Sequence, residues 1–458
     1  MRISFLTAGL LIRFAAESSA LRSHYSSVAY LGHLRFTSAL RMLPDAPTEI
    51  SALKSRGTPS LYASTAADAG SERAPSGSLP PWLPAFLTAA IGGLLFGSDI
   101  GASSSVVRIL GSGASEFGAL DAFSLGQVAS ASLFGAMIAS ASLIGLGDKN
   151  IGRQLELRVA AALFTVGTLI QSLAGAFPLM MLGRVIYGLG IGTAMHVAPL
   201  YIAETSPDNL RGKLVSLKEA AIVLGIVAGY VAGSIFGGDE NWRAVFESAL
   251  PFEALMLLGS LIVPESPRWL ALRGKTDEAV RAIQEVQGID VATAMKGVSE
   301  MVRMSANTEG AVEDSSVFAK LNEITSSKYN MQALTIGVGL VLFQQLSGQP
   351  SVLYFANRIF EAAGLGYEAA VGIGLFKFAM TLLSANLVEN PNYGRRSLLL
   401  YGNSIITASL VGLAALYAFP GADGPNQPAI LACMLAFVGG YQIGFGPISW
   451  LVKSTYSQ

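Results

Sequence analysis

The 458-residue chain is poor in charge, because Asp, Glu, Lys and Arg together make up only 13% of it. A soluble globular chain carries about 25% charged residues, so the deficit argues against a soluble enzyme. The net charge of -1 offers no basic surface for a nucleic-acid partner. The single cysteine, Cys433, excludes an intramolecular disulfide framework and a cysteine-cluster metal site. With no histidine pair and no metal-spaced carboxylates, the sequence predicts no catalytic residue, metal or organic cofactor.

Long apolar runs take the place of the missing charge. A helix that crosses a bilayer needs about 20 mostly apolar residues, and the chain beyond Pro81 offers ten such runs. They cover 83–107, 122–147, 157–176, 178–203, 214–237, 244–263, 331–356, 366–388, 397–419 and 428–452. The runs at 83–107, 178–203 and 331–356 are interrupted by Gly or Pro, which membrane helices tolerate.

The layout predicts an all-α polytopic membrane protein with four segments. Residues 1–80 would be a transit peptide and disordered leader, and 81–264 a six-helix bundle. Residues 265–330 would form a polar central loop with an amphipathic helix over Thr276–Val286, and 331–458 a second bundle of four helices.

The leader has the composition of an organelle-targeting segment. Residues 1–40 contain Arg2, Arg13, Arg22 and Arg35 against one acid, Glu17, a pattern typical of transit peptides. A secretory signal is the alternative. The leader thus indicates an organelle; the chloroplast envelope is implied only by the resemblance described below, and mitochondrial, vacuolar and plasma membranes are left open.

The positive charges of the loops gather on one side of the expected membrane, which is called the basic side below. The N-terminus, the central loop and the C-terminus share this side. The charges that define it are Lys149, Arg153, Arg158, Arg211, Lys213, Lys218, Arg395 and Arg396.

Charged residues within the apolar runs need a partner or a purpose, because each costs about 2.5–3.5 kcal/mol on insertion scales. Asp99 lies in the first run and Arg184 in the fourth. The two could pair, and protonation of the acid would then release the arginine; a static ion pair is the alternative. Lys377 must face a polar interior or extend to the interface, Glu219 could pair at the interface, and Glu253 has no partner that the sequence identifies.

The seventh run is rich in neutral polar groups. Amides and a phenol both donate and accept hydrogen bonds, which suits a ligand with many hydroxyls, such as a sugar or polyol. Hydrogen bonds between helices are the alternative use of these groups. Trp450 in the tenth run could stack on a sugar ring or anchor the helix at the interface. The polar groups of the seventh run are Gln344, Gln345, Ser347, Gln349 and Tyr354.

Several motifs together resemble the sugar porters of the major facilitator superfamily, over roughly residues 81–450. With the leader, the chain is particularly similar to the plant chloroplast D-xylose-proton symporter-like proteins. The motifs are Gly92-Gly93-x-Leu95-Phe96-Gly97-x-Asp99, Gly183-Arg184, Pro199-x-Tyr201-x-x-Glu204-x-x-Pro207-x-x-x-Arg211-Gly212, Trp242-Arg243, Pro264-Glu265-Ser266-Pro267-Arg268-Trp269, Gln344-Gln345-x-Ser347-Gly348, Gly394-Arg395-Arg396 and Gly446-Pro447-x-x-Trp450.

The resemblance implies the major facilitator fold and alternating access around a sugar held between two halves. It implies that Asp99 takes the proton and that Arg184 is its partner. It also implies a set of sugar-binding positions, in which Glu219 stands where many relatives have Gln and Lys377 occupies a polar position. The set is Glu219, Gln344, Gln345, Tyr354, Lys377, Gly446 and Trp450.

A second set implied by the resemblance controls gating on the basic side. Here the chain departs from the family pattern in the spacing of two loops, after the second and eighth runs. In the seventh run, apart from this set, Pro350 replaces an Asn, which removes an amide contact and a backbone donor. Family members also continue beyond Trp450 with two more helices, so the resemblance predicts six helices plus four. The gating set is Asp148, Gly152, Arg153, Glu204, Arg211, Glu265, Arg268, Glu389, Gly394, Arg395 and Arg396.

The sequence therefore predicts a proton-coupled symporter of a monosaccharide, hexose or pentose, and not an enzyme. A facilitative sugar or polyol uniporter and a non-transporting sugar sensor or truncated regulatory isoform are the alternatives. The proton is the expected coupling ion, and the expected partners are a sugar and the lipid bilayer. The oligomeric state stays open. His196 is expected to be a packing or cavity residue.

Overall fold

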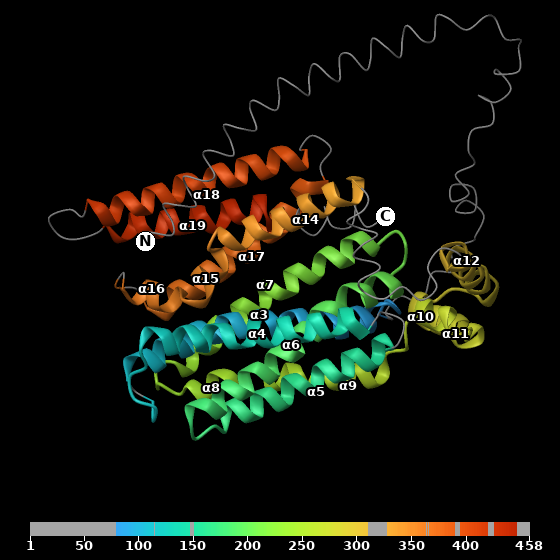
Figure 1. Cartoon of the computed structure of the whole chain (residues 1–458), viewed down its shortest axis with the longest axis horizontal. Coiled ribbons are helices and arrows are strands. Elements are labelled where there is room, and N and C mark those ends of the chain that lie inside the picture. The colour runs from blue at the N-terminus through green and yellow to red at the C-terminus, as the bar shows by residue number, and fades with distance from the viewer. Residues whose placement is uncertain are drawn as a thin grey trace, which may run out of the picture. The chain divides into compact units, whose positions relative to one another are not determined.

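The computed structural model describes residues 79–113, 115–146, 151–309, 328–362, 364, 366–389, 394–419 and 426–446. From Pro80 onward they belong to one compact unit, and the described residues form helices and connecting turns without a strand (Figure 1). The expected leader up to residue 78, Asp148 and Trp450 lie outside the described residues.

The first helices follow the expected runs closely. A C-cap glycine in the left-handed region, Gly113 with φ of 86°, ends the first helix five residues later than expected. The sixth run is divided in two, and Pro251 stands in the first turn of the second piece, where its missing N–H costs no hydrogen bond. The helices are α3 (Leu83–Ser112), α4 (Ala122–Leu146), α5 (Arg153–Ser172), α6 (Phe177–Thr205), α7 (Arg211–Phe236), α8 (Trp242–Glu247) and α9 (Leu250–Ile262).

The polar stretch after α9 folds into three helices, α10 (Pro267–Leu272), α11 (Thr276–Gln287) and α12 (Val291–Glu309). The predicted amphipathic helix is confirmed as α11. Its buried face, which includes Val280 and Ile283, packs with α10 and α12 in a small core of its own. In Figure 1 these helices, in yellow, lie at one end of the N-terminal bundle.

The C-terminal helices are α14 (Lys328–Leu346), α15 (Gln349–Tyr354), α16 (Ala356–Ala362), α17 (Tyr367–Glu389), α18 (Arg395–Ala418) and α19 (Gln427–Gly444). The expected run 331–356 is broken into α14, α15 and the start of α16. The break lies at Gly348, whose φ of 81° favours glycine, and at Pro350 in the first turn of α15.

Nine helical segments among the described residues are long and apolar enough to cross a membrane. Nine of the ten expected runs correspond to them, while the broken seventh run, whose longest piece is α14, does not meet the same criterion. The count of six plus four helices therefore stays a prediction, as do the expected domain boundaries.

Small residues allow the N-terminal helices to approach closely, which is how helices associate in membranes. A Cβ on Gly97 of α3 would lie 1.8 Å from the carbonyl oxygen of Ile222 in α7, and one on Gly225 of α7 would lie 2.0 Å from that of Leu94. The seam between α3 and α7 therefore requires glycine on both helices.

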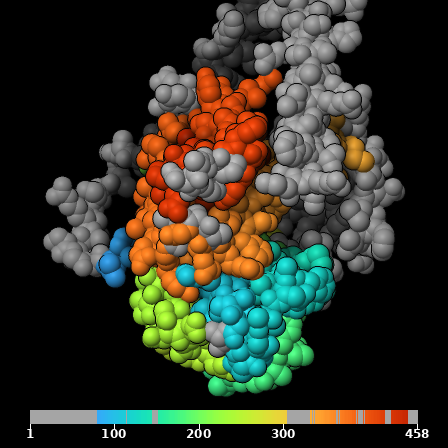
Figure 2. All heavy atoms as spheres, turned by 90° about the vertical axis from the view of Figure 1, so that its left-hand side faces the viewer, coloured from blue at the N-terminus to red at the C-terminus, as the bar shows by residue number. Residues whose placement is uncertain are grey.

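The helices from α14 onward form a second group that packs against the first. Figure 2 shows this group, in orange and red, resting on the cyan and green N-terminal helices. Helix α17 packs along α7, while α15 and α16 contact α3. The interface between the two groups is thus formed largely by α3 and α7 on one side and by α15 to α17 on the other.

Candidate functional site

The structure brings together the predicted pair Asp99 and Arg184. Arg184 Nη1 lies 3.1 Å from Asp99 Oδ1, and Nη2 lies 3.4 Å from Oδ2. The side chain of Asp99 is 1% exposed and that of Arg184 is 0% exposed. Asp99 comes from the middle of α3 and Arg184 from the first part of α6, so this ion pair links two helices of the N-terminal bundle away from water.

Arg184 has further partners that the sequence did not indicate. Its Nε donates to the carbonyl oxygen of Val128 at 2.5 Å, and its Nη2 donates to the hydroxyls of Ser103 at 2.9 Å and Ser132 at 3.1 Å. Ser132 in turn donates to Asp99 Oδ2 at 2.7 Å. The guanidinium also lies over the ring of Phe246, 5.2 Å from its centre. Arg184 would therefore keep several partners if Asp99 lost its charge.

Glu253, for which the sequence named no partner, lies on α9 with 0% exposure. Thr168 of α5 donates its hydroxyl to Glu253 Oε1 at 2.6 Å. The other oxygen, Oε2, has no hydrogen-bond partner. Glu253 is therefore a second buried carboxylate of the N-terminal bundle, separate from the pair of Asp99 and Arg184, and a neutral hydroxyl donates to it.

The polar groups of the seventh run are divided by the break between α14 and α15. Gln344 is half-buried and faces the hydroxyl of Tyr441, whereas Gln345 is exposed. Gln349 is buried, and its Nε2 has no hydrogen-bond partner. The buried hydroxyl of Tyr354 lies near Ser132 without a hydrogen bond of ordinary geometry. Thus Tyr354 approaches the hydroxyl that donates to Asp99.

Lys377 is buried at 4% exposure in the middle of α17. Its Nζ donates to Oε1 of Gln442 in α19 at 2.7 Å and lies 5.4 Å from the ring centre of Tyr441. The carboxylate of Glu219 on α7 acts on it electrostatically. Gly446, at the end of α19, borders Gln442, since a Cβ there would lie 2.9 Å from Gln442 Nε2.

Four of these side chains, on α7, α15 and α19, share one chemical property. Each presents a buried polar atom that makes no hydrogen bond with the protein, although such atoms are normally paired. Groups left in this state on neighbouring helices can receive a ligand that carries several donors and acceptors. The unpaired atoms are Glu219 Oε2, Gln349 Nε2, Tyr354 Oη and Gln442 Nε2.

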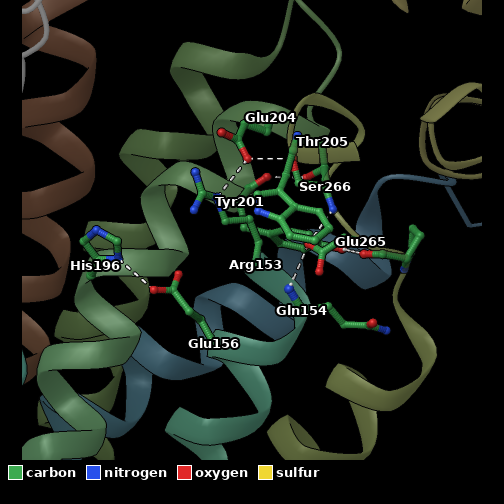
Figure 3. Close-up of polar contacts among 11 residues, drawn as sticks. Arg153, Gln154, Glu156, His196, Tyr201, Glu204, Thr205, Glu265 and Ser266 are labelled. Carbon is green, nitrogen blue, oxygen red and sulfur yellow. Dashed lines mark hydrogen bonds and ion pairs between the residues drawn. The ribbon is translucent and has the colours of Figure 1, made fainter. Parts of the chain in front are cut away.

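Three of the predicted gating residues, Arg153, Glu204 and Glu265, form a cluster on the basic side (Figure 3). Arg153 Nε lies 3.3 Å from Glu204 Oε2, which also accepts a 2.6 Å hydrogen bond from the hydroxyl of Ser266. Glu265 Oε1 accepts from the backbone nitrogens of Gln154 at 3.1 Å and Ser266 at 2.8 Å. The motifs that begin α5, end α6 and precede α10 are therefore tied to one another.

Gly152 is part of this cluster for a steric reason. A Cβ on Gly152 would lie 2.1 Å from Oε2 of Glu265, so the carboxylate occupies the space that any other residue would need. The hydroxyl of Tyr201 adds a 2.6 Å hydrogen bond to the carbonyl of Pro264, and Gln154 Nε2 adds one of the same length to that of Val263.

The remaining gating residues lie outside the cluster. Arg211 pairs at the surface with Asp208 at 2.5 Å, and the side chains of Arg268 and Arg396 are exposed. Glu389 ends α17, and Gly394 precedes Arg395, the first residue of α18. A latch between the two halves formed by these residues stays a prediction.

His196 has a partner that sequence reasoning missed. Its Nδ1 lies 3.3 Å from Oε1 of Glu156, a side chain that is 4% exposed, while His196 itself is 28% exposed (Figure 3). Glu156 follows Arg153 by three residues on α5, so it lies on the same face of that helix. The spacing of three residues between Arg153 and Glu156 was therefore the signal in the sequence that the two side chains share a face of α5.

The two halves are joined on the side away from the basic side. Asn357 of α16 donates from Nδ2 to the hydroxyls of Ser104 at 3.2 Å and Ser105 at 2.9 Å, and all three are buried. Arg108 lies 3.2 Å from Glu361. Further hydrogen bonds run from Tyr230 to the carbonyl of Leu353 at 2.9 Å and from Tyr367 to that of Gly237 at 3.2 Å.

Comparison with known proteins gives consistent results. A family model described as sugar (and other) transporter matches residues 85–457. "D-xylose-proton symporter-like 3, chloroplastic" from Arabidopsis thaliana is 42% identical over 393 residues, which cover 81% of this chain and 68% of the relative.

Solved structures of a bacterial transporter are also similar. The partially occluded inward open conformation of the xylose transporter XylE from E. coli has a TM-score of 0.66 and 28% identity, covering 82% of this chain and 88% of that chain. XylE, a proton:xylose symporter, bound to 6-bromo-6-deoxy-D-glucose gives a TM-score of 0.66 and 26% identity, covering 81% of each chain.

Proposed function

The chain belongs to the sugar transporter family, with the major facilitator fold, and from this membership we propose that it is a proton-coupled monosaccharide symporter. Its relatives and its fold are those of multi-pass membrane transporters rather than of enzymes. The observation that carries the proposal is the fully buried pair of Asp99 and Arg184, since ionisable residues inside a membrane are costly and rare and mark functional sites such as proton relays.

Proton coupling follows from the partners of this pair. Protonation of Asp99 removes the negative charge that faces Arg184, and the ion pair between α3 and α6 becomes a neutral hydrogen bond. Arg184 keeps Val128 and Ser103 as acceptors, so the protonated state is tolerated. The proton thus changes the relative free energies of two conformations and shifts their populations, as alternating access requires.

An uncharged sugar is the proposed substrate, a hexose or a pentose. Amide and phenol groups with unpaired donors and acceptors lie on α15, at Gln349 and Tyr354, and on α19, at Gln442, and polyhydroxylated ligands satisfy such groups without bringing charge. The relatives support this choice, since the Arabidopsis protein is named for D-xylose and XylE is described as bound to a glucose derivative. Trp450 and Gln345 stay predicted members of the site.

The proposed location is the chloroplast envelope. Two observations support it, namely the arginine-rich, acid-poor residues 1–40 and the chloroplastic name of the Arabidopsis relative. Import of residues 1–80 fused to a fluorescent protein into plant chloroplasts tests this part of the proposal.

The experiment that tests coupling separates uphill accumulation from exchange. In proteoliposomes, a pH gradient should drive D-xylose uptake by the wild type above equilibrium. Asp99→Asn, which keeps the shape but not the charge, should abolish accumulation while sugar counterflow persists. Asp277→Asn, on the exposed side of α11, is the matched control and should accumulate sugar normally. Undiminished accumulation by the Asp99→Asn variant would refute the assignment.

A further inference from the structure

The hydroxyl of Ser132 on α4 is part of the proton site, and its one hydrogen is already used there. It donates to Asp99 Oδ2 at 2.7 Å and accepts from Arg184 Nη2 at 3.1 Å. The side chain is fully buried. Because a serine hydroxyl has one hydrogen and two acceptor positions, these contacts leave one acceptor position and no donor. Ser132 can therefore donate elsewhere only if Asp99 stops accepting from it.

Tyr354 brings a second hydroxyl to the level of the proton site from the C-terminal half. Asn357 bonds to Ser104, which precedes it by 253 positions, and Glu361 pairs with Arg108 at the same offset. The chain after Tyr354 therefore runs parallel to the last turns of α3. Continued back by three residues, this register places Tyr354 at the level of residue 101, within two residues of the acid.

Helix α4 presents Ser132 to the same place. Val128, one turn before Ser132, belongs to the buried apolar cluster that also contains Tyr354. The hydroxyl of Tyr354 lies near that of Ser132, yet it makes no hydrogen bond with the described residues. Two buried hydroxyls, one from each half, are thus neighbours without a bond between them.

Protonation of Asp99 would free the hydrogen of Ser132. The ionised acid can only accept, so the hydroxyl donates to it. When Oδ2 carries a proton, that oxygen becomes the donor and the oxygen of Ser132 accepts from it. The hydrogen of Ser132 then needs another acceptor. The backbone carbonyl one turn earlier, that of Val128, already accepts from Arg184 Nε at 2.5 Å, whereas Tyr354 Oη has no hydrogen-bond partner.

We propose that Ser132 is a positioning residue that conveys the protonation of Asp99 to the C-terminal half through Tyr354. Protonation reverses the hydrogen bond between Asp99 and Ser132, and the released hydrogen is donated to Tyr354 Oη. The new bond joins α4 to α15 and stabilises the closed arrangement of the side away from the basic side, whereas loss of the proton removes it. The inference rests on the proposed function, because symport requires this closure to respond to the proton.

Other ionisable groups packed around this contact keep their own partners. On α6, Arg184 is always charged, and Tyr187 donates to a backbone carbonyl at 3.0 Å. On α7, Tyr230 donates to another carbonyl at 2.9 Å. On α9, Glu253 accepts from a hydroxyl of α5. The charge of Asp99 therefore sets the direction of the reversible bond.

The test measures the initial rate of D-xylose uptake into proteoliposomes at saturating sugar while the external pH is varied. Tyr354→Phe removes an acceptor that is used only when Asp99 is protonated, so protonation becomes harder. The pH of half-maximal uptake should fall by about 0.3–1 pH unit, which corresponds to the effect of one hydrogen bond, about 2- to 10-fold. Tyr401→Phe on α18 and Ser130→Ala on α4, both at exposed positions, are matched controls and should leave the pH profile unchanged.

Variants of Ser132 show whether the effect passes through its hydroxyl. In a Ser132→Ala background, Tyr354→Phe should cause no further shift, because both substitutions remove the same hydrogen bond. Ser132→Thr keeps the hydroxyl, so in that background Tyr354→Phe should lower the half-maximal pH as it does in the wild type. The threonine background also keeps the test decisive where the Ser132→Ala variant folds poorly.

Three outcomes overturn the inference, while accumulation of xylose by the wild type leaves the proposed function standing. An unchanged half-maximal pH in Tyr354→Phe means that its hydroxyl does not respond to the proton. A half-maximal pH that rises means that Tyr354 donates while Asp99 is ionised. A shift of equal size in the Ser132→Ala background means that Tyr354 acts without Ser132. Absence of proton-driven accumulation by the wild type refutes the proposed function itself, and this inference with it.

Discussion

The contacts that close the side opposite the basic side differ in strength, and the difference predicts which substitution opens this side. Asn357 is 1% exposed and donates two side-chain hydrogen bonds, to Ser104 and Ser105. At about 0.5–1.5 kcal/mol for each net hydrogen bond, Asn357→Ala removes ~1–3 kcal/mol from the closed state. Such a loss shifts the equilibrium by about 5- to 150-fold.

The ion pair between Arg108 and Glu361 looks stronger but should matter less. The side chain of Glu361 is 51% exposed and that of Arg108 is 21% exposed, and an exposed pair is worth about 0–1 kcal/mol. Arg108 also stays over the ring of Tyr367, 4.1 Å from its centre, when the carboxylate is removed. Glu361→Gln should therefore shift the equilibrium less than about 5-fold.

The assay is the labelling rate of a cysteine that closure buries. Ala356, next to Asn357, is 1% exposed, and the natural Cys433 is the only cysteine to replace. In a Cys433→Ser, Ala356→Cys background, a membrane-impermeant maleimide should label the Asn357→Ala variant much faster than the parent and the Glu361→Gln variant only slightly faster. Faster labelling of the Glu361→Gln variant, or equal rates in all three, would show that buried hydrogen bonds do not control this closure.

Two further predictions concern other contacts of the N-terminal bundle. Gly152→Ala should lower the free energy of unfolding by about 1–3 kcal/mol, because the new Cβ would lie 2.1 Å from a carboxylate oxygen of Glu265. Gly126→Ala, inside α4 with open space around it, should instead leave the thermal unfolding midpoint in detergent unchanged or slightly raised, because Ala favours a helix over Gly. The hydrogen bond from Arg243 lowers the pKa of Glu116 in the loop between α3 and α4. The contact between these two side chains should therefore stabilise the fold at neutral pH, and this contribution should be lost as the pH falls through the lowered pKa of Glu116. The difference in unfolding midpoint between the wild type and Glu116→Gln should vanish in acid, and a constant difference across the pH range would contradict this sign.

The charged members of the site could be predicted from the sequence, because a charged residue within a long apolar run is costly to insert into a membrane and is easily recognised. Asp99 and Arg184 interrupt apolar runs, and a charge in such a place demands a partner, so the pair could be proposed although the two residues are 85 positions apart. Lys377 was flagged by the same reasoning. The break at Gly348 and Pro350 was not predicted, because the runs at 83–107 and 178–203 also contain Gly or Pro and yet form the continuous helices α3 and α6.

The neutral partners could not be predicted for the opposite reason. The acids Asp99 and Glu253 accept hydrogen bonds from Ser132 and Thr168. Serine and threonine are common in membrane helices, where the hydroxyl can bond to a backbone carbonyl of the preceding turn. Their presence in a run therefore carries no demand for a distant acceptor. Which hydroxyl lies beside which acid depends on how one helix is rotated against another. Close approach at glycines fixes that rotation, between α3 and α7 and between α4 and α6.

Helix α3 connects the proton site to the closure between the halves. Asp99 and Ser103, which bind Arg184, are followed within two residues by Ser104 and Ser105, which bind Asn357 of the other half. A helix rises 1.5 Å per residue, so these contacts lie within ~9 Å on one rigid element. Loss of the Asp99 charge weakens the hold of α6 on α3 at the same turns where α3 holds α16. Any rotation of α3 would therefore change its contacts with both α6 and α16, because the serine run after Asp99 places these contacts on adjacent turns.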